Sequence, residues 1–363
     1  MKNNYESKLK KCTELLITND SKTISSLMLA SKKPSIISMV LLPYLALFFK
    51  EAQEHFSTRV IDKEFDEQLD DLRNSIKLLS EKYNKTETKF LEIDFQQDQH
   101  FKDLLTFDFT KELNIHYNLG VYFDNNGNVV GDTQLLNLYL YSAFKDGKIQ
   151  KDTTYKLGVS FGKSLSLIRM KTHQKKTASI KELESIKLGY IDFNTNVMDS
   201  VFVYNLNKGL NLFILHMLSM IGMSKYIIQR MLATNNTWRL RCEYITAHNI
   251  WSGLRIISEH FKQNSYEGID VSLFNDLVEK GRNFFPSAFR NAMFHYELIK
   301  GNDYCIKEEN YRSDILLFGL VETVFDGKTA QDYYAELREY LDEVERCLKV
   351  WFNFDQSAIN WDL

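Results

Sequence analysis

The sequence is poor in residues that interrupt helices. Its 363 residues include only 3 prolines and 15 glycines. Because proline and glycine are the residues least compatible with a helix interior, we expect long uninterrupted helices. At about 100–200 residues per domain, the length predicts two or three domains with ample material for buried cores.

Cysteine is equally sparse. The four cysteines, Cys12, Cys242, Cys305 and Cys347, lie far apart and form no CxxC pair. Their spacing excludes the usual zinc-ribbon and thioredoxin patterns and fits a reducing compartment. The chain also lacks a Walker-type phosphate loop and an HExxH motif, which argues against an NTPase or a zinc protease. We expect neither a metal ion nor a cofactor.

The most apolar run of the sequence is too short to cross a membrane. The most apolar stretch, residues 35–49, has 15 residues and contains Pro43. A membrane-spanning helix needs about 20 apolar residues, so this stretch predicts a buried helix instead. The N-terminal segment is polar and has no small-residue cleavage site. We therefore expect no secretion signal, no membrane partner and a cytoplasmic protein.

The chain has no large excess of positive or negative charge, since it contains 45 Lys and Arg residues and 48 Asp and Glu residues. This balance excludes a globally basic nucleic-acid binder. The charge is nevertheless uneven: residues 51–112 hold 16 acidic and 9 basic residues, whereas residues 145–187 hold 11 basic and 4 acidic residues. The basic block has aromatic residues among its lysines, which suits a nucleic-acid backbone and equally suits a protected sheet edge.

The spacing of apolar residues changes within the first half of the chain. Residues 1 to about 95 have apolar side chains at three- and four-residue steps, which predicts helices. Residues 121–131 place a turn rich in Gly and Asn between β-branched and aromatic runs, which indicates a hairpin. Residues 136–144 and 155–162 alternate like half-buried strands. We therefore expect a small antiparallel sheet in this middle section, and the sheet would carry the basic block.

From about residue 194 onward the helical period returns. The pattern predicts one or two helices within 198–232, a helix over 238–261 capped by Asn236, and a helix over 271–280 that stops at Gly281. Two more helices follow, one opened by Pro286 and one over 330–354. Antiparallel helices joined by short connections indicate an up-and-down bundle.

The predicted fold class is therefore α+β and mostly helical, organised in three regions. Residues 1–100 would form a helical region, and residues 101–190 a small antiparallel β region with the basic block. Residues 191–363 would form the helical bundle.

The sharpest local feature is the segment Phe289 to Leu298, which reads FRNAMFHYEL. At about 100° per residue on a helix, Asn291 and His295 stand about 40° apart on one face. Arg290 lies about 140° from His295 but is long enough to curl back, so the three side chains can line one side of a cleft.

These residue types support one coherent chemistry. A guanidinium is a permanent, forked donor that matches phosphate oxygens. An imidazole can accept or donate a proton near neutral pH. Arg290 could thus stabilise charge on a phosphate while His295 moves protons and Asn291 holds the imidazole or a phosphate oxygen. Together these groups would cleave RNA without a metal, by attack of the ribose 2′-hydroxyl on the phosphate. On spacing alone, a surface arginine and a capped histidine remain the simpler interpretation.

The segment resembles the Arg-polar-x-x-x-His signature of HEPN domains, helical modules found in ribonucleases and toxins. Arg290, Asn291 and His295 match the signature, and the resemblance covers roughly residues 195–355. It implies a helical bundle, a catalytic role for these three residues, no metal, and a homodimer in which two motifs face each other. In members paired with nucleotidyltransferase antitoxins, a tyrosine two residues after the histidine is modified. Glu297 occupies that position here and the tyrosine is Tyr296, so we do not expect that modification.

The resemblance leads to two hypotheses of different classes. The first is a metal-independent endoribonuclease acting as a toxin or an antiviral effector, with RNA as substrate and an antitoxin or regulatory protein left open as a partner. The second is a catalytically inactive HEPN-like module that binds RNA or dimerises. Phe285, Phe289 and Phe294 are candidates for a dimer interface and equally for the bundle core.

Other basic residues are weaker candidates for binding the RNA backbone. They are Arg239, Arg241, Arg282, Lys175 and Lys176. As single residues they could equally be solvated surface charges. Two further histidines of the bundle region have no Cys, Asp or Glu at metal-ligand spacing, and we interpret them as structural. These are His248 and His260.

Overall fold

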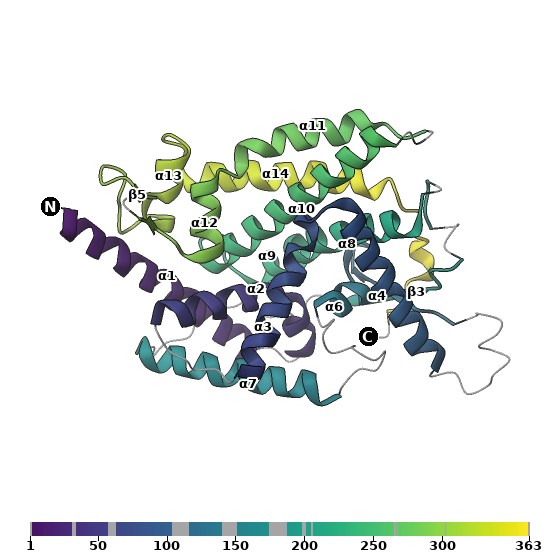
Figure 1. Ribbon diagram of the computed structural model, residues 1–363, viewed down its shortest axis with the longest axis horizontal. Helices are drawn as coiled ribbons and strands as arrows, with labels where there is room; N and C mark the ends of the chain where they lie inside the picture. Colours follow the sequence, from purple (N-terminus) through teal and green to yellow (C-terminus); the bar gives the residue numbers. More distant parts are fainter. Residues whose placement is uncertain are drawn as a thin grey trace.

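A computed structural model confirms a mostly helical α+β fold (Figure 1). It describes residues 2–30, 34–56, 63–103, 116–139, 151–173, 187–197, 201–204, 206–264, 266, 268–301 and 303–361.

The described part of the first hundred residues is almost entirely helical, as expected. They form α1 (Lys2–Ala30), α2 (Pro34–Phe56), α3 (Lys63–Ile76) with the 3-10 turn η1 (Lys77–Ser80), and α4 (Tyr83–Asp103). The second half of the apolar stretch 35–49 is buried in α2, from Leu41 to Phe49, as predicted for a core helix. Pro43 lies inside this helix without ending it.

The expected hairpin is confirmed. Strands β1 (Leu119–Asp124) and β2 (Val129–Asp132) pair antiparallel, and β3 (Leu188–Phe193) pairs with the other side of β1. Asp124 shapes the turn because its carboxylate accepts hydrogen bonds from the backbone N–H groups of Asn126 and Asn128, each at 2.9 Å. This is an Asx-type turn, in which a short polar side chain replaces a backbone partner.

The two other predicted strands are wrong. Residues 136–139 belong to α6 (Thr133–Tyr139), and residues 155–162 lie within α7 (Lys151–Lys171), while 140–144 fall outside the described residues. The buried side chains of α7 explain the difference, because they recur at three- and four-residue steps over the whole helix. They are Leu157, Phe161, Leu165 and Ile168. The short window 155–162 shows alternation only by chance, and the described part of the basic block is mainly helical.

The C-terminal half contains the predicted helices. They are α8 (Lys208–Gly222), which continues through the π-helical turn η4 (Met223–Ile228) into α9 (Gln229–Met231), then α10 (Thr237–Gln263), α11 (Val271–Gly281) with η5 (Arg282–Phe284), α12 (Ser287–His295), η6 (Leu316–Gly319), α13 (Leu320–Val324) and α14 (Ala330–Lys349). Asn236 caps α10 as expected, since its side chain accepts from the N–H of Arg239. A two-stranded ribbon, β4 (Ile299–Lys300) with β5 (Asp303–Tyr304), follows α12, and the 3-10 turn η7 (Gln356–Ala358) follows α14.

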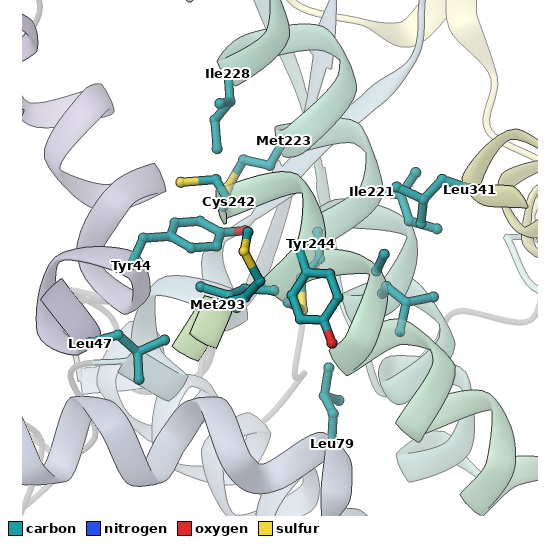
Figure 2. Close-up of a cluster of buried hydrophobic side chains, with 14 of the residues drawn as sticks. Tyr44, Leu47, Leu79, Ile221, Met223, Ile228, Cys242, Tyr244, Met293 and Leu341 are labelled. Atoms are coloured by element: carbon teal, nitrogen blue, oxygen red, sulfur yellow. The ribbon is translucent and has the colours of Figure 1, made fainter. Parts of the chain in front are cut away.

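Helix α10 lies at the centre of the molecule. It packs against α8, α11, α12 and α14 of the C-terminal half and also against α1, α4 and η1 of the N-terminal half (Figure 1). Figure 2 shows the resulting core, in which Tyr44 and Leu47 of α2 and Leu79 of η1 approach Tyr244 of α10 and Met293 of α12. Segments from both halves of the chain therefore surround the helix that carries the motif.

One helical segment, Lys208–Met231, is long and apolar enough to cross a membrane by composition. However, 89% of its most apolar window is buried inside the protein. This burial is what a core helix of a globular protein requires, because its hydrophobic surface is already covered by protein.

Gly222 at the end of α8 provides a test of how closely the sheet packs on the bundle. A Cβ atom at this position would lie 1.7 Å from the carbonyl oxygen of Val129 in β2. We expect Gly222→Ala to lower the free energy of unfolding by about 3 kcal/mol or more, because the backbone must move apart. The measurement is urea unfolding.

Gly158 is the matched control for this substitution. It lies in α7, and a Cβ atom there would meet nothing within 4 Å. Gly158→Ala should raise stability by about 0.5–1 kcal/mol, since alanine is the better helix former. Equal effects of the two substitutions would contradict the close contact at Gly222.

Candidate active site

The motif lies on α12, whose two ends have clear local causes. Pro286 precedes the first turn with extended backbone (ψ 146°), and its fixed φ suits a helix start. The helix ends at His295 because Tyr296 adopts a left-handed conformation (φ 55°). The end is three residues earlier than the apolar pattern through Leu298 suggests. His295 is therefore the last residue of the helix.

The polar residues of the motif lie at the edge of the core. Arg290, Asn291 and His295 are partly exposed, whereas Phe289 and Phe294 are buried. The guanidinium carbon of Arg290 lies 5.2 Å from the ring centre of Phe294, the residue next to His295. Arg290 therefore extends along α12 toward its C-terminal half.

The side chains of Arg290 and Asn291 have no polar partner in the part of the chain that the structure describes. No described carboxylate pairs with Arg290, and no hydrogen bond from the amide of Asn291 is found there. Phe285, Phe289 and Phe294 pack against Tyr244 of α10. These phenylalanines fill the bundle core, so they are not surface residues that await a dimer partner.

His295 has one internal partner. Its Nδ1 atom lies 2.8 Å from Oε1 of Glu51 on α2, across 244 residues of sequence. The histidine side chain is 29% exposed and the glutamate side chain is 11% exposed. The motif is thus completed by a helix that lies outside the region covered by the family resemblance.

The C-terminal end of α12 is held by a buried polar cluster. Arg241 donates to the carbonyl oxygens of Ala292 and Met293 and, through Nε, to the carboxylate of Asp20 at 3.0 Å. Tyr296 donates to the same carboxylate at 2.6 Å, and its ring lies 3.6 Å beneath the guanidinium. Burial raises the pKa of Tyr296 well above its usual value, so the hydroxyl stays a donor. In this position Tyr296 is also inaccessible to a modifying enzyme.

Two predicted RNA contacts are therefore in the core. Arg241 is 3% exposed and Arg239 is 6% exposed. Arg239 pairs with Glu243 at 2.6 Å and donates to the carbonyl oxygens of Gln229 and Leu232. Neither guanidinium is free to bind a phosphate. Glu243 lies four residues after Arg239, whereas Asp20 lies 221 residues from Arg241, a distance at which no spacing pattern indicates a pair.

Arg282 is the predicted RNA contact that lies on the surface. It is exposed and pairs with Glu279 at 3.1 Å. It lines a cavity of about 370 Å³ between α10 and α11, together with Trp251, Arg255 and Lys262. Trp251 also contacts Phe285 next to the motif helix. The remaining candidates, Lys175 and Lys176, fall outside the described residues.

His248 is the residue beside the motif that sequence reasoning treated only as structural. Aromatic rings enclose it, and burial together with the positive charge of Arg290 lowers its pKa to about 4. Its Nδ1 atom is buried without a hydrogen-bond partner. A neutral, enclosed imidazole agrees with the structural interpretation. His260 likewise has an internal role, since it bonds the hydroxyl of Tyr266 at 2.6 Å.

A second motif in the chain does not form a site. Gly158, Ser160 and Gly162 have the GxSxG spacing of hydrolase nucleophile elbows. That chemistry requires a sharp turn between a strand and a helix. Ser160 lies in the middle of α7, and its carbonyl oxygen accepts from Ser164 in the same helix.

Comparisons with known proteins do not extend the family resemblance. No family model, no curated protein and no solved structure matches the chain. Among the described residues, no group of three His, Cys, Asp or Glu side chains is placed to hold a metal ion.

The buried cluster at the end of α12 gives a stability prediction. Asp20→Ala leaves Arg241 buried without its carboxylate, and we expect it to lower the free energy of unfolding by about 3–5 kcal/mol. The exposed pair Lys280–Glu343 (2.7 Å) is the control. Lys280→Ala should cost less than about 1 kcal/mol. Urea unfolding measures both, and a small cost for Asp20→Ala would show that the cluster does not hold α12.

Proposed function

We propose that the protein is a metal-independent endoribonuclease of the HEPN type, acting as a toxin or an antiviral effector. The observation that carries the proposal is that Arg290, Asn291 and His295 are all partly exposed on one short helix, with His295 as its last residue. Arg290 has no carboxylate partner among the described residues, although Arg239 and Arg241 nearby are both paired. An uncompensated guanidinium next to a histidine suits a phosphate ligand.

The proposed reaction uses the ribose as the nucleophile. The 2′-hydroxyl oxygen attacks phosphorus while a histidine takes its proton, and the bond to the 5′-oxygen breaks as that oxygen gains a proton. The products are a 2′,3′-cyclic phosphate and a 5′-hydroxyl end. Arg290 stabilises the charge that develops on the phosphate oxygens, and Asn291 can donate to the same group.

Labelled single-stranded RNA incubated with the purified protein tests the activity. We expect cleavage that persists in EDTA and leaves cyclic phosphate ends. His295→Ala and Arg290→Ala should each lower the rate by about 100-fold or more, since each removes a group that acts on the transition state. Arg312→Ala is the control, because Arg312 is an exposed arginine that binds only local carbonyl groups. RNA left intact by a folded protein, or full activity in His295→Ala, would contradict the proposal.

The alternative is a catalytically inactive module that binds RNA or dimerises. The internal bond of His295 to Glu51 favours this alternative if that bond has only a structural role. The two functions differ in a binding experiment with RNA that carries 2′-O-methyl groups and cannot be cleaved. Binding of this RNA by a protein that never cleaves ordinary RNA would support the alternative.

We also propose that the active form is a homodimer. One motif supplies one histidine, whereas acid–base cleavage uses one group to remove a proton and another to donate one. A two-fold axis past α12 would bring two copies of His295 and Arg290 to one cleft. The interface would use surface residues of the bundle, because the phenylalanines of α12 are buried within their own chain.

Mixed dimers test the composite cleft. We expect a dimer of one wild-type and one His295→Ala subunit, purified with two affinity tags, to lose well over half of the wild-type activity. Two independent sites would instead lose half, because each wild-type subunit would keep its full rate. A proportional loss would therefore refute the shared cleft while leaving the ribonuclease activity intact.

A further inference from the structure

Glu51 lies on a part of α2 that is anchored in the core by its neighbours. Its neighbours on α2, Phe48, Phe49 and Ala52, are all at most 1% exposed. The ring of Phe48 contacts that of Tyr296, the residue that ends α12, with centres 6.5 Å apart. The backbone on both sides of the Glu51–His295 bond is therefore anchored in the core. Side chains fixed in this way can set the orientation of a ring precisely.

The bond has a direct chemical consequence for the imidazole. A carboxylate can only accept hydrogen bonds, so the 2.8 Å contact places the proton on Nδ1 of His295. The other ring nitrogen, Nε2, has no partner among the described residues, and its lone pair is left for another molecule. A neutral imidazole in water prefers the opposite form, with the proton on Nε2, so the partner decides which nitrogen is basic.

We infer that Glu51 is a positioning residue, which holds His295 as the Nδ1–H tautomer and aims Nε2 at the substrate. This inference rests on the proposed ribonuclease function for its catalytic consequence. It gives the N-terminal helices a part in the site: α2 orients the histidine while α12 carries it. Glu51 itself touches no substrate and moves no proton. It acts only through the ring of His295.

The tautomer can be measured without any assay of activity. Protein with ¹⁵N-labelled histidine gives long-range ¹H–¹⁵N spectra that distinguish the two neutral forms. The His295 signal is assigned from its loss in His295→Gln. Spectra are recorded at a pH high enough that raising it further no longer changes the histidine signals. We expect the Nδ1–H form in the wild type. Glu51→Leu removes the acceptor at similar volume and should shift His295 toward the Nε2–H form.

RNA cleavage by the same proteins supplies the second measurement. We expect Glu51→Leu to lower the rate by about 10- to 100-fold, as is typical when a group that orients a histidine is lost. Glu51→Gln keeps an acceptor oxygen and should keep more of the Nδ1–H form and more of the rate. Glu54→Leu is the matched control, since Glu54 is an exposed glutamate on the same helix. Circular dichroism confirms that each variant is folded.

The outcomes separate this inference from the proposed function. An unchanged tautomer in Glu51→Leu overturns the inference, whether or not the protein cleaves RNA. A rate that stays the same or rises in Glu51→Leu also overturns it, and a rise would show that Glu51 blocks the histidine. If the wild type cleaves no RNA, the ribonuclease proposal fails, while a shifted tautomer still establishes that Glu51 orients His295.

Discussion

The buried carboxylate of Asp20 is the constraint on which the motif helix depends. It is 0% exposed and accepts hydrogen bonds from Thr237, Arg241 and Tyr296. A buried charge is costly unless it is paired and its lone pairs are satisfied, so these donors cannot be separated cheaply. Through them, α1 is tied to the start of α10 and to the end of α12. The position of His295 is thus set by a residue in the first helix of the chain.

The same cluster explains why α12 ends where it does. The last carbonyl groups of a helix have no partner within the helix, and cations near the C-terminal end satisfy them well. Arg241 donates to two of these carbonyl groups, and Tyr296 turns into the left-handed region so that its hydroxyl reaches Asp20. Termination at His295 leaves that side chain at the edge of the core, where Glu51 can reach it.

Sequence patterns predict the parts of this structure that are local. The cap of α10 at Asn236, the start of α12 at Pro286 and the hairpin at Asp124 follow from neighbouring residues, and each is confirmed. The strand predictions are wrong at 136–139 and 155–162 because a window of eight or nine residues is too short to separate a period of 2 from a period of 3.6. The helix face of α7 becomes clear only when Leu165 and Ile168 are counted with Leu157 and Phe161.

The composition of the site depends on contacts that no sequence spacing reveals. Glu51 meets His295 across 244 residues, and Asp20 meets Arg241 across 221. As a result, the motif residues Arg290, Asn291 and His295 could be chosen from their spacing, whereas the role of the other arginines could not. The partner of Arg241 lies far along the chain, whereas Arg239 has its partner only four residues away, and it is the burial of that pair that spacing does not reveal.

The distribution of these carboxylates is itself an argument about the ligand. Arg239 and Arg241 are buried and each has an acidic partner, which is the condition under which a protein can bury a guanidinium. Arg290 is partly exposed, lacks such a partner among the described residues, and lowers the pKa of the buried His248 through its charge. Its guanidinium therefore has no neutralising carboxylate among the described residues. A phosphate bound beside Arg290 would supply the missing counter-charge.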